Sequence, residues 1–167
     1  MLLHIPQVLT LAQVTEIRQL LDTTEHWTNG RQSAGSQAQK IKNNLQLDVH
    51  SELYQAISSA ILNTLKQQLL IQSAALPKHI LRPMLNCYQD SGNYGNHVDN
   101  AIHTCSDTGQ LIRTDVSLTL FLSNPDEYEG GELVVEDNYG MHEVKLDAGD
   151  AILYPATSLH RVEPVTS

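Results

Sequence analysis

The sequence predicts an α+β fold in which a double-stranded β-helix, a jelly roll of two packed sheets, carries N-terminal helices on one outer face. Two observations lead to this prediction. The first 80 residues contain apolar positions at helical spacing, whereas the later residues form many short stretches of alternating apolar and polar residues. We expect one continuous domain of 167 residues, with a helical support region over 1–80 and a jelly-roll core over 81–167.

Two helices are expected in the support region. Thr10 and Gln13 match a capping box, and the apolar positions after them predict a helix that ends near Asp22. A second helix should begin near Ser51 and continue through residues 69–71. Its buried stripe recurs every four residues, at Leu53, Ile57, Ile61 and Leu65.

The core region is expected to be β-structure. Apolar residues alternate with polar ones from Val116 to Leu122, which predicts a clear strand. A further strand should carry His97 and Asp99, and others are expected over the ranges 83–89, 132–136, 141–146 and 151–155. Two polar stretches are expected to be irregular: 100–112 as a loop, and 27–39 as a strand-and-loop connection.

Charge and composition exclude several classes of function. The net charge of −9, with only 10 Lys and Arg, argues against a nucleic-acid partner. The sequence has no apolar run long enough to span a membrane, and no signal-peptide pattern at residues 1–6. Two cysteines do not make a disulfide framework, so we expect a cytoplasmic protein. The sequence leaves the oligomeric state open, and a homodimer is compatible with it.

His97 and Asp99 are the first candidates for a metal site. They lie two positions apart, so in an extended segment both side chains point to the same side. Two histidines and one carboxylate, with open positions opposite, form the facial triad that suits non-haem Fe(II). His160 is the candidate for the third ligand, and a jelly roll would bring it to His97 across 63 positions of sequence.

Several ordered motifs together resemble the prolyl-hydroxylase branch of the Fe(II)- and 2-oxoglutarate-dependent dioxygenases, and most closely the bacterial PKHD-type hydroxylases. The resemblance covers nearly the whole chain. Its motifs are residues 4–6, 42–46, 86–88, Tyr94, 97–99, 113–115, 130–133, 148–155 and 159–162.

This resemblance implies a function and roles for individual residues. His97, Asp99 and His160 would bind Fe(II), Tyr88 would face the 2-oxoglutarate pocket, and Tyr94 would lie on the substrate side of the metal. The family reaction couples decarboxylation of 2-oxoglutarate to succinate with hydroxylation of a substrate, here unidentified. O₂ would be the second co-substrate, with ascorbate as a further candidate cofactor.

One departure from the family leaves alternatives open. Family members carry an arginine for the distal carboxylate of 2-oxoglutarate about ten residues after the distal histidine, on the final strand, whereas this chain has seven residues after His160. Arg161 should point away from His160, and Arg113 lies in a different motif. We therefore expect a C-terminally truncated jelly roll that lacks its final strand. A non-catalytic metal-binding or sensory cupin-like module is the main alternative, and a zinc hydrolase is a third reading.

Overall fold

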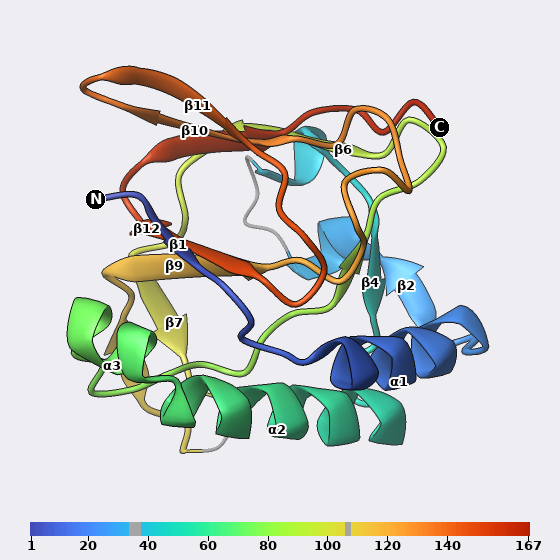
Figure 1. Cartoon of the computed structure of the whole chain (residues 1–167), viewed down its shortest axis with the longest axis horizontal. Helices are drawn as coiled ribbons and strands as arrows, with labels where there is room; N and C mark the ends of the chain where they lie inside the picture. The colour runs from blue at the N-terminus through green and yellow to red at the C-terminus, as the bar shows by residue number, and fades with distance from the viewer. Residues whose placement is uncertain (34–37, 106–107) are drawn as a thin grey trace.

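A computed structural model describes residues 1–33, 38–105 and 108–167, and its elements form three layers (Figure 1). A five-stranded antiparallel sheet forms one layer, a three-stranded antiparallel sheet the next, and helices the third. The five-stranded sheet has the order β11 (Gly140–Val144), β10 (Leu133–Asp137), β13 (Leu159–Val162), β6 (Asn93–His97), β3 (Lys42–Asn43). The three-stranded sheet has the order β1 (Leu3–Ile5), β12 (Ala151–Pro155), β9 (Val116–Leu120).

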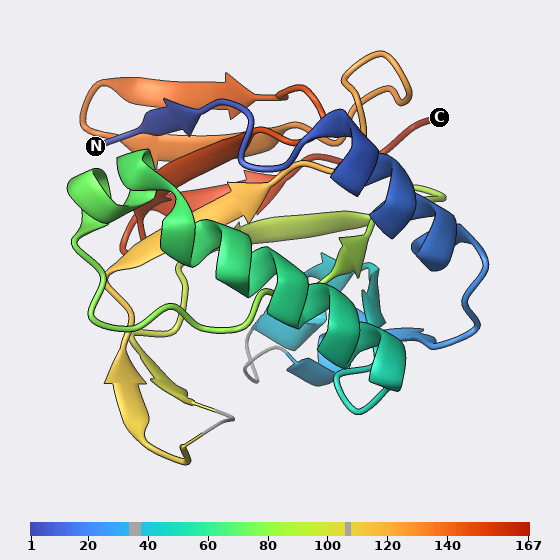
Figure 2. The same cartoon turned by 60° about the horizontal axis from the view of Figure 1, so that its bottom comes forward.

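The remaining elements surround these two sheets. A second three-stranded sheet has the order β2 (Trp27–Asn29), β4 (Leu45–Leu47), β5 (Asn86–Cys87). The strands β7 (Ile102–Thr104) and β8 (Leu111–Arg113) form a hairpin that projects from the body of the molecule (Figure 2). The helices are α1 (Leu11–Asp22), α2 (Glu52–Gln67) and α3 (Leu69–Ala75), with short 3₁₀ turns at Gly30–Ser33 and Ala38–Lys40.

Two apolar clusters hold the layers together. The first lies between the two main sheets, where Leu133 and Val135 of β10 meet Ile152 and Tyr154 of β12. Alternation along β12 places Ala151 and Leu153 on its opposite face, where they join the core formed with the helices. The helical side of this second cluster comprises Val14, Ile17, Tyr54, Ile57, Ile61, Leu65 and Ile71. The expected packing of helices on one outer face is therefore confirmed.

The starts of both long helices agree with the sequence. The Thr10 hydroxyl accepts a hydrogen bond from the Gln13 backbone N–H, while the Gln13 side chain accepts one from the Thr10 N–H, which completes the capping box. The Ser51 hydroxyl accepts a hydrogen bond from the Tyr54 N–H and caps α2. These caps satisfy backbone donors that the first helical turn leaves unpaired.

The expected continuation of the second helix through residues 69–71 is wrong in one respect. Gln68 is extended (φ −73°, ψ 111°) and its N–H returns to the carbonyls of Thr64 and Leu65, so α2 ends and α3 begins. The break turns Leu69 into solvent at 80% exposure, although Ile71 is buried. The apolar run therefore contains a change of helix direction that periodicity did not reveal.

Two expectations for the core region also need correction. The stretch 100–112 is not simply a loop, because Ile102 pairs with Arg113 and Thr104 with Leu111 in the hairpin; residues 106–107 lie outside the described residues. Within the expected strand over 83–89, only Asn86–Cys87 forms a strand, β5, which pairs with β4. Proline at 83 lacks a backbone N–H, and positive φ angles at residues 90 and 91 turn the chain.

The connection over 27–39 begins with a strand as expected, and residues 34–37 of it lie outside the described residues. None of the helices in the described residues is both long and apolar enough to cross a membrane.

Candidate metal centre

Strand pairing brings the two candidate histidines together. His97 in β6 is the register partner of His160 in β13, and a bulge follows His160 before Val162 pairs with Tyr94. The two imidazole centroids are 4.1 Å apart at an interplanar angle of 52°. Both rings face the space between the main sheets, because Val135, the partner of His160 in β10, belongs to the inner apolar cluster.

Backbone carbonyl groups orient both rings in the same way. The Nδ1 atom of His97 lies 2.8 Å from the Gly95 carbonyl oxygen, and that of His160 lies 3.0 Å from the Ser158 carbonyl oxygen. A carbonyl only accepts, so each Nδ1 carries the proton and each Nε2 presents a lone pair. Burial lowers the pKa of His97, which favours the neutral imidazole that a metal requires.

Asp99 completes the group. It lies just beyond the end of β6, two residues after His97, and its Oδ1 atom is 3.8 Å from His97 Nε2 and 3.6 Å from His160 Nε2. One ligand atom from each of the three residues lies within 4.8 Å of the others. His97 and Asp99 direct their side chains to the same side, as expected, although the strand itself ends at His97 and Asp99 lies beyond it.

These donors fit a divalent transition metal. Two imidazole nitrogens and one carboxylate oxygen form the facial donor set that suits Fe(II) and leaves further positions open. Oδ2 of Asp99 accepts a hydrogen bond of 2.5 Å from the Ser117 hydroxyl, so only Oδ1 remains directed at the histidines. Sequence reasoning missed Ser117. The alternation along β9 indicates only that the Ser117 hydroxyl lies on the face opposite the apolar residues Val116 and Leu118.

Tyrosine rings surround the centre. Tyr94 stacks on His97 with 3.6 Å between ring centroids and a 16° interplanar angle. Tyr154 of β12 packs its ring against His160 at 5.1 Å and 62°. Burial raises the pKa of Tyr88, and the neighbouring Tyr94 and Tyr154 add to this rise. The structure therefore brings Tyr94 and Tyr154 against the two histidines, with Tyr88 near both of these tyrosines. The sequence predicted Tyr154 only as part of a strand.

Tyr88 also borders a cavity of about 280 Å³ that contains none of the three candidate ligands. Its other lining residues are Gln89, Asp90, Tyr128, Val165, Thr166 and Ser167.

Neither arginine considered from the sequence faces the centre. The Arg161 guanidinium donates to Glu163 at 2.5 Å and contacts the Met141 sulfur at 3.8 Å. Arg113 pairs with Asp115 at 2.9 Å, and its side chain is 77% exposed. The expectation that Arg161 is a poor substitute for the family arginine agrees with these contacts.

A pair of antiparallel sheets with a His-Asp-His cluster between them is typical of non-haem Fe(II) oxygenases. Residues 83–167 match the family model described as the 2OG-Fe(II) oxygenase superfamily. The chain is 53% identical to a PKHD-type hydroxylase of Aliarcobacter butzleri and 52% identical to one of Hyphomonas neptunium. Each alignment covers 99% of this chain and 73% of the relative. The chain belongs to the 2OG-Fe(II) oxygenase superfamily.

Solved structures agree on the fold. A prolyl-4-hydroxylase of Pseudomonas putida gives a TM-score of 0.61 at 18% identity, covering 99% of this chain and 87% of that chain. A prolyl hydroxylase of Trichoplax adhaerens, in complex with a peptide fragment of hypoxia inducible factor, gives 0.62 at 12% identity, with coverages of 99% and 78%. The family model and the PKHD-type relatives identify the protein as a 2-oxoglutarate-dependent hydroxylase that uses Fe(II), 2-oxoglutarate and O₂.

Proposed function

We propose that His97, Asp99 and His160 bind the Fe(II) at which this enzyme hydroxylates its substrate. The observation that carries the proposal is that one ligand atom from each of the three residues lies within 4.8 Å of the others. When bound, Fe(II) would supply the activation of O₂ that is coupled to the decarboxylation of 2-oxoglutarate.

The protein's own contribution is to hold these donors in place. The carbonyls of Gly95 and Ser158 keep the proton on each Nδ1, so both Nε2 atoms stay available for the metal. Ser117 keeps one carboxylate oxygen of Asp99 occupied and leaves the other for the metal. Packing of aromatic rings against both imidazoles limits their rotation and excludes water from their faces.

The co-substrate and the substrate would bind on different sides of the centre. Tyr88, a half-buried tyrosine near Tyr94 and Tyr154, is assigned to the 2-oxoglutarate side. Tyr94, stacked on His97, is assigned to the substrate side. The fold would be a double-stranded β-helix whose final strand, with the arginine for 2-oxoglutarate, is not among the residues of this chain. The engagement of Arg161 and Arg113 elsewhere supports this placement.

The test is an anaerobic titration of 2-oxoglutarate into the Fe(II)-loaded protein, following the visible charge-transfer band of the chelate. Three proteins are compared: this chain, its His97→Ala variant, and this chain extended by the C-terminal segment of a PKHD-type relative. The His97→Ala variant should lose metal and band together. A band that is strong only in the extended protein would support the placement of the arginine outside this chain.

A centre that binds metal but not 2-oxoglutarate in this chain is the second candidate for the site, favoured by the engagement of Arg161 and Arg113 away from the centre. It predicts metal binding that 2-oxoglutarate does not change in either the native or the extended chain. Metal retained without any band would therefore reject the proposed iron and 2-oxoglutarate site.

A further inference from the structure

Residues 98–101, which include Asp99, lie between two strands. β6 ends at His97 and β7 begins at Ile102, so the strand pairing that aligns His97 with His160 does not extend to Asp99. Ser117 holds the Asp99 carboxylate, but the direction of that side chain also depends on the backbone from which it extends. A ligand in such a segment needs further contacts to keep one oxygen directed at the histidines.

Thr114 supplies such contacts from across the base of the hairpin formed by β7 and β8 (Figure 2). Its hydroxyl donates a hydrogen bond of 2.5 Å to the Asn100 carbonyl oxygen, and its backbone N–H donates one of 3.0 Å to the Ala101 carbonyl oxygen. A threonine hydroxyl bonded to a main-chain carbonyl restrains the segment that carries that carbonyl. Thr114 therefore fixes the carbonyl groups of the two residues that follow Asp99.

The chain after Thr114 is itself anchored. The carbonyl oxygen of the next residue, Asp115, accepts a hydrogen bond of 3.1 Å from the Ala156 N–H, and β9 then begins. Ser117, three residues after Thr114, donates the hydrogen bond to the Asp99 carboxylate. The same short stretch thus holds Asp99 from two directions, through the backbone that follows it and through its side chain.

We propose that Thr114 is a positioning residue of the metal centre. By fixing the backbone after Asp99, it keeps Oδ1 of that residue directed at His97 and His160. This inference rests on the proposed function, because it takes Asp99 as a metal ligand. It adds a residue that acts on the metal through the main chain rather than through a ligand side chain.

The experiment compares Co(II) affinity, measured by competition with a chelator, in the native protein and three variants. Thr114→Val keeps the branched shape but loses the hydroxyl, so it should weaken Co(II) binding about twofold to tenfold, the scale of one net hydrogen bond. Thr114→Ser keeps the hydroxyl and should restore most of the affinity. The matched control is Thr28→Val, because the Thr28 hydroxyl also donates to a main-chain carbonyl, that of Gln46 at 3.0 Å. This control should bind Co(II) like the native protein.

The visible spectrum of bound Co(II) separates positioning from a general loss of stability, because it reports the arrangement of the ligands. At saturating Co(II), the spectrum should change in Thr114→Val and should match that of the native protein in Thr114→Ser and Thr28→Val. Urea denaturation of the metal-free proteins measures the stability of each variant separately. A change in stability alone would leave the spectrum of the saturated protein unchanged.

Amide exchange tests the inference in the native protein, even if Thr114→Val does not fold. Coupling between metal binding and a hydrogen bond is reciprocal, so Zn(II) should slow exchange of the Thr114 amide proton by about twofold or more. The Asp48 amide is the control, because it bonds to the His26 carbonyl at 2.9 Å in another part of the fold. Its exchange should be the same with and without Zn(II).

Three outcomes would overturn the inference: native Co(II) affinity and spectrum in Thr114→Val, no effect of Zn(II) on the Thr114 amide, or equal slowing of the Thr114 and Asp48 amides. Failure of the proposed function has a different signature, because Asp99→Ala would then bind Co(II) as tightly as the native protein. Weakened binding in Asp99→Ala with native binding in Thr114→Val would reject the role of Thr114 alone.

Discussion

The Ser117 hydroxyl donates a hydrogen bond of 2.5 Å to Asp99 Oδ2, joining strand β9 to the carboxylate that closes the candidate metal centre. Without this donor, Asp99 would be free to rotate or to offer both oxygens to a metal. Residues that orient a ligand in this way typically change metal affinity by one to two orders of magnitude.

We therefore expect Ser117→Ala to weaken Co(II) binding about tenfold to a hundredfold, measured by competition with a chelator. Ser117→Thr retains a hydroxyl and should restore most of the affinity. Ser73→Ala is the control, because among the described residues the Ser73 hydroxyl bonds to carbonyls within its own helix. Equal affinity in the native protein and Ser117→Ala would show that the hydrogen bond does not position the ligand.

Most of the centre could be predicted from sequence, since His97 and Asp99 are close in the chain and His160 lies in a recognisable motif. Ser117 could not be singled out, because its role depends on β9 passing Asp99 in space. Lys42 was visible as a polar residue between helices, but only the pairing of β3 with β6 brings it to Tyr94. Contacts between strands distant in sequence were thus the missing information.

The fold was predicted to a similar extent. Strong periodicity located the helices and β9, and the capping box gave the start of α1. Short strands such as β1 and β3 escaped, because two or three residues carry too little alternation to stand out. The division at residue 80 and the cytoplasmic location stay predictions.

The helix-facing core should be sensitive to truncation at Ile61, which is 1% exposed in α2. Ile61→Ala removes buried methyl and methylene groups and leaves a cavity, so we expect a loss of about 2–5 kcal/mol in the free energy of unfolding. Urea denaturation measures it, with the m-value as a check that the unfolded state is unchanged. Leu69→Ala, at a position 80% exposed, should change stability by no more than about 0.5 kcal/mol.

Gly149 should not tolerate a side chain. Its φ of +98° is unfavourable for other residues, and an added Cβ would lie 2.5 Å from the Leu9 carbonyl oxygen. We expect Gly149→Ala to lower the free energy of unfolding by about 2–5 kcal/mol, through backbone strain and the clash together. Gly109→Ala separates the two effects, because its φ is +69° and its Cβ meets nothing within 4 Å. In that control the free energy of unfolding should fall by only about 1–2 kcal/mol. Equal losses of stability in the two variants would exclude a contribution from the clash.

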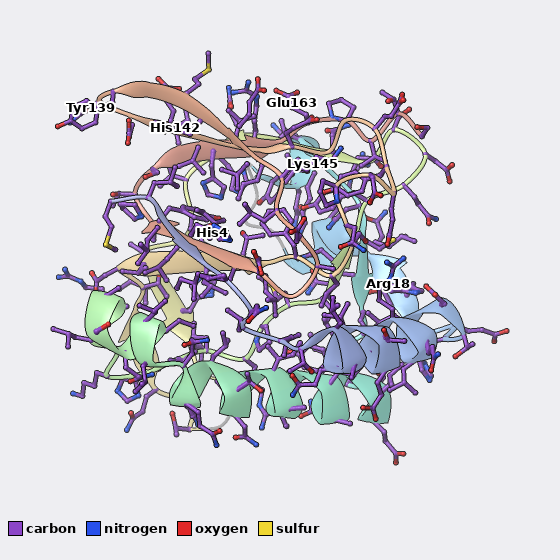
Figure 3. The ribbon with its side chains drawn as sticks, in the orientation of Figure 1. His4, Arg18, Tyr139, His142, Lys145 and Glu163 are labelled. Atoms are coloured by element: carbon purple, nitrogen blue, oxygen red, sulfur yellow. The ribbon has the colours of Figure 1, made fainter. Side chains whose placement is uncertain are left out.

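Arg18 projects from α1 (Figure 3). Its ion pair with Glu127 connects α1 to the segment before β10. The hydrogen bond from Arg18 holds the pKa of Glu127 below its ordinary value. A depressed carboxyl pKa stabilises the fold at pH values above the unfolded pKa, and this contribution is lost as the pH falls through the folded pKa. The pair is partly exposed, so the effect on stability is small.

Arg18→Met should therefore raise the pKa of Glu127 toward its ordinary value, as measured by the ¹³C shift of the Glu127 carboxyl carbon during titration. The difference in stability between the native protein and the variant should shrink as the solution is acidified. Lys66→Met removes a cation from α2 and should leave the Glu127 titration unchanged. A similar rise in the pKa of Glu127 in both variants would assign the effect to net charge rather than to the ion pair.

The direct pairing of His97 with His160 also bears on how the sheet folds. A slip of one residue between β6 and β13 would bring Leu159 or Arg161 into the place of His160 and turn the second imidazole to the other face. That slip would release a metal ion held by both rings. A bound ion would therefore act as a cross-link that selects one alignment of the two strands. Metal occupancy and strand alignment then form a single linked equilibrium, and chelation should loosen this part of the sheet before the helical layer.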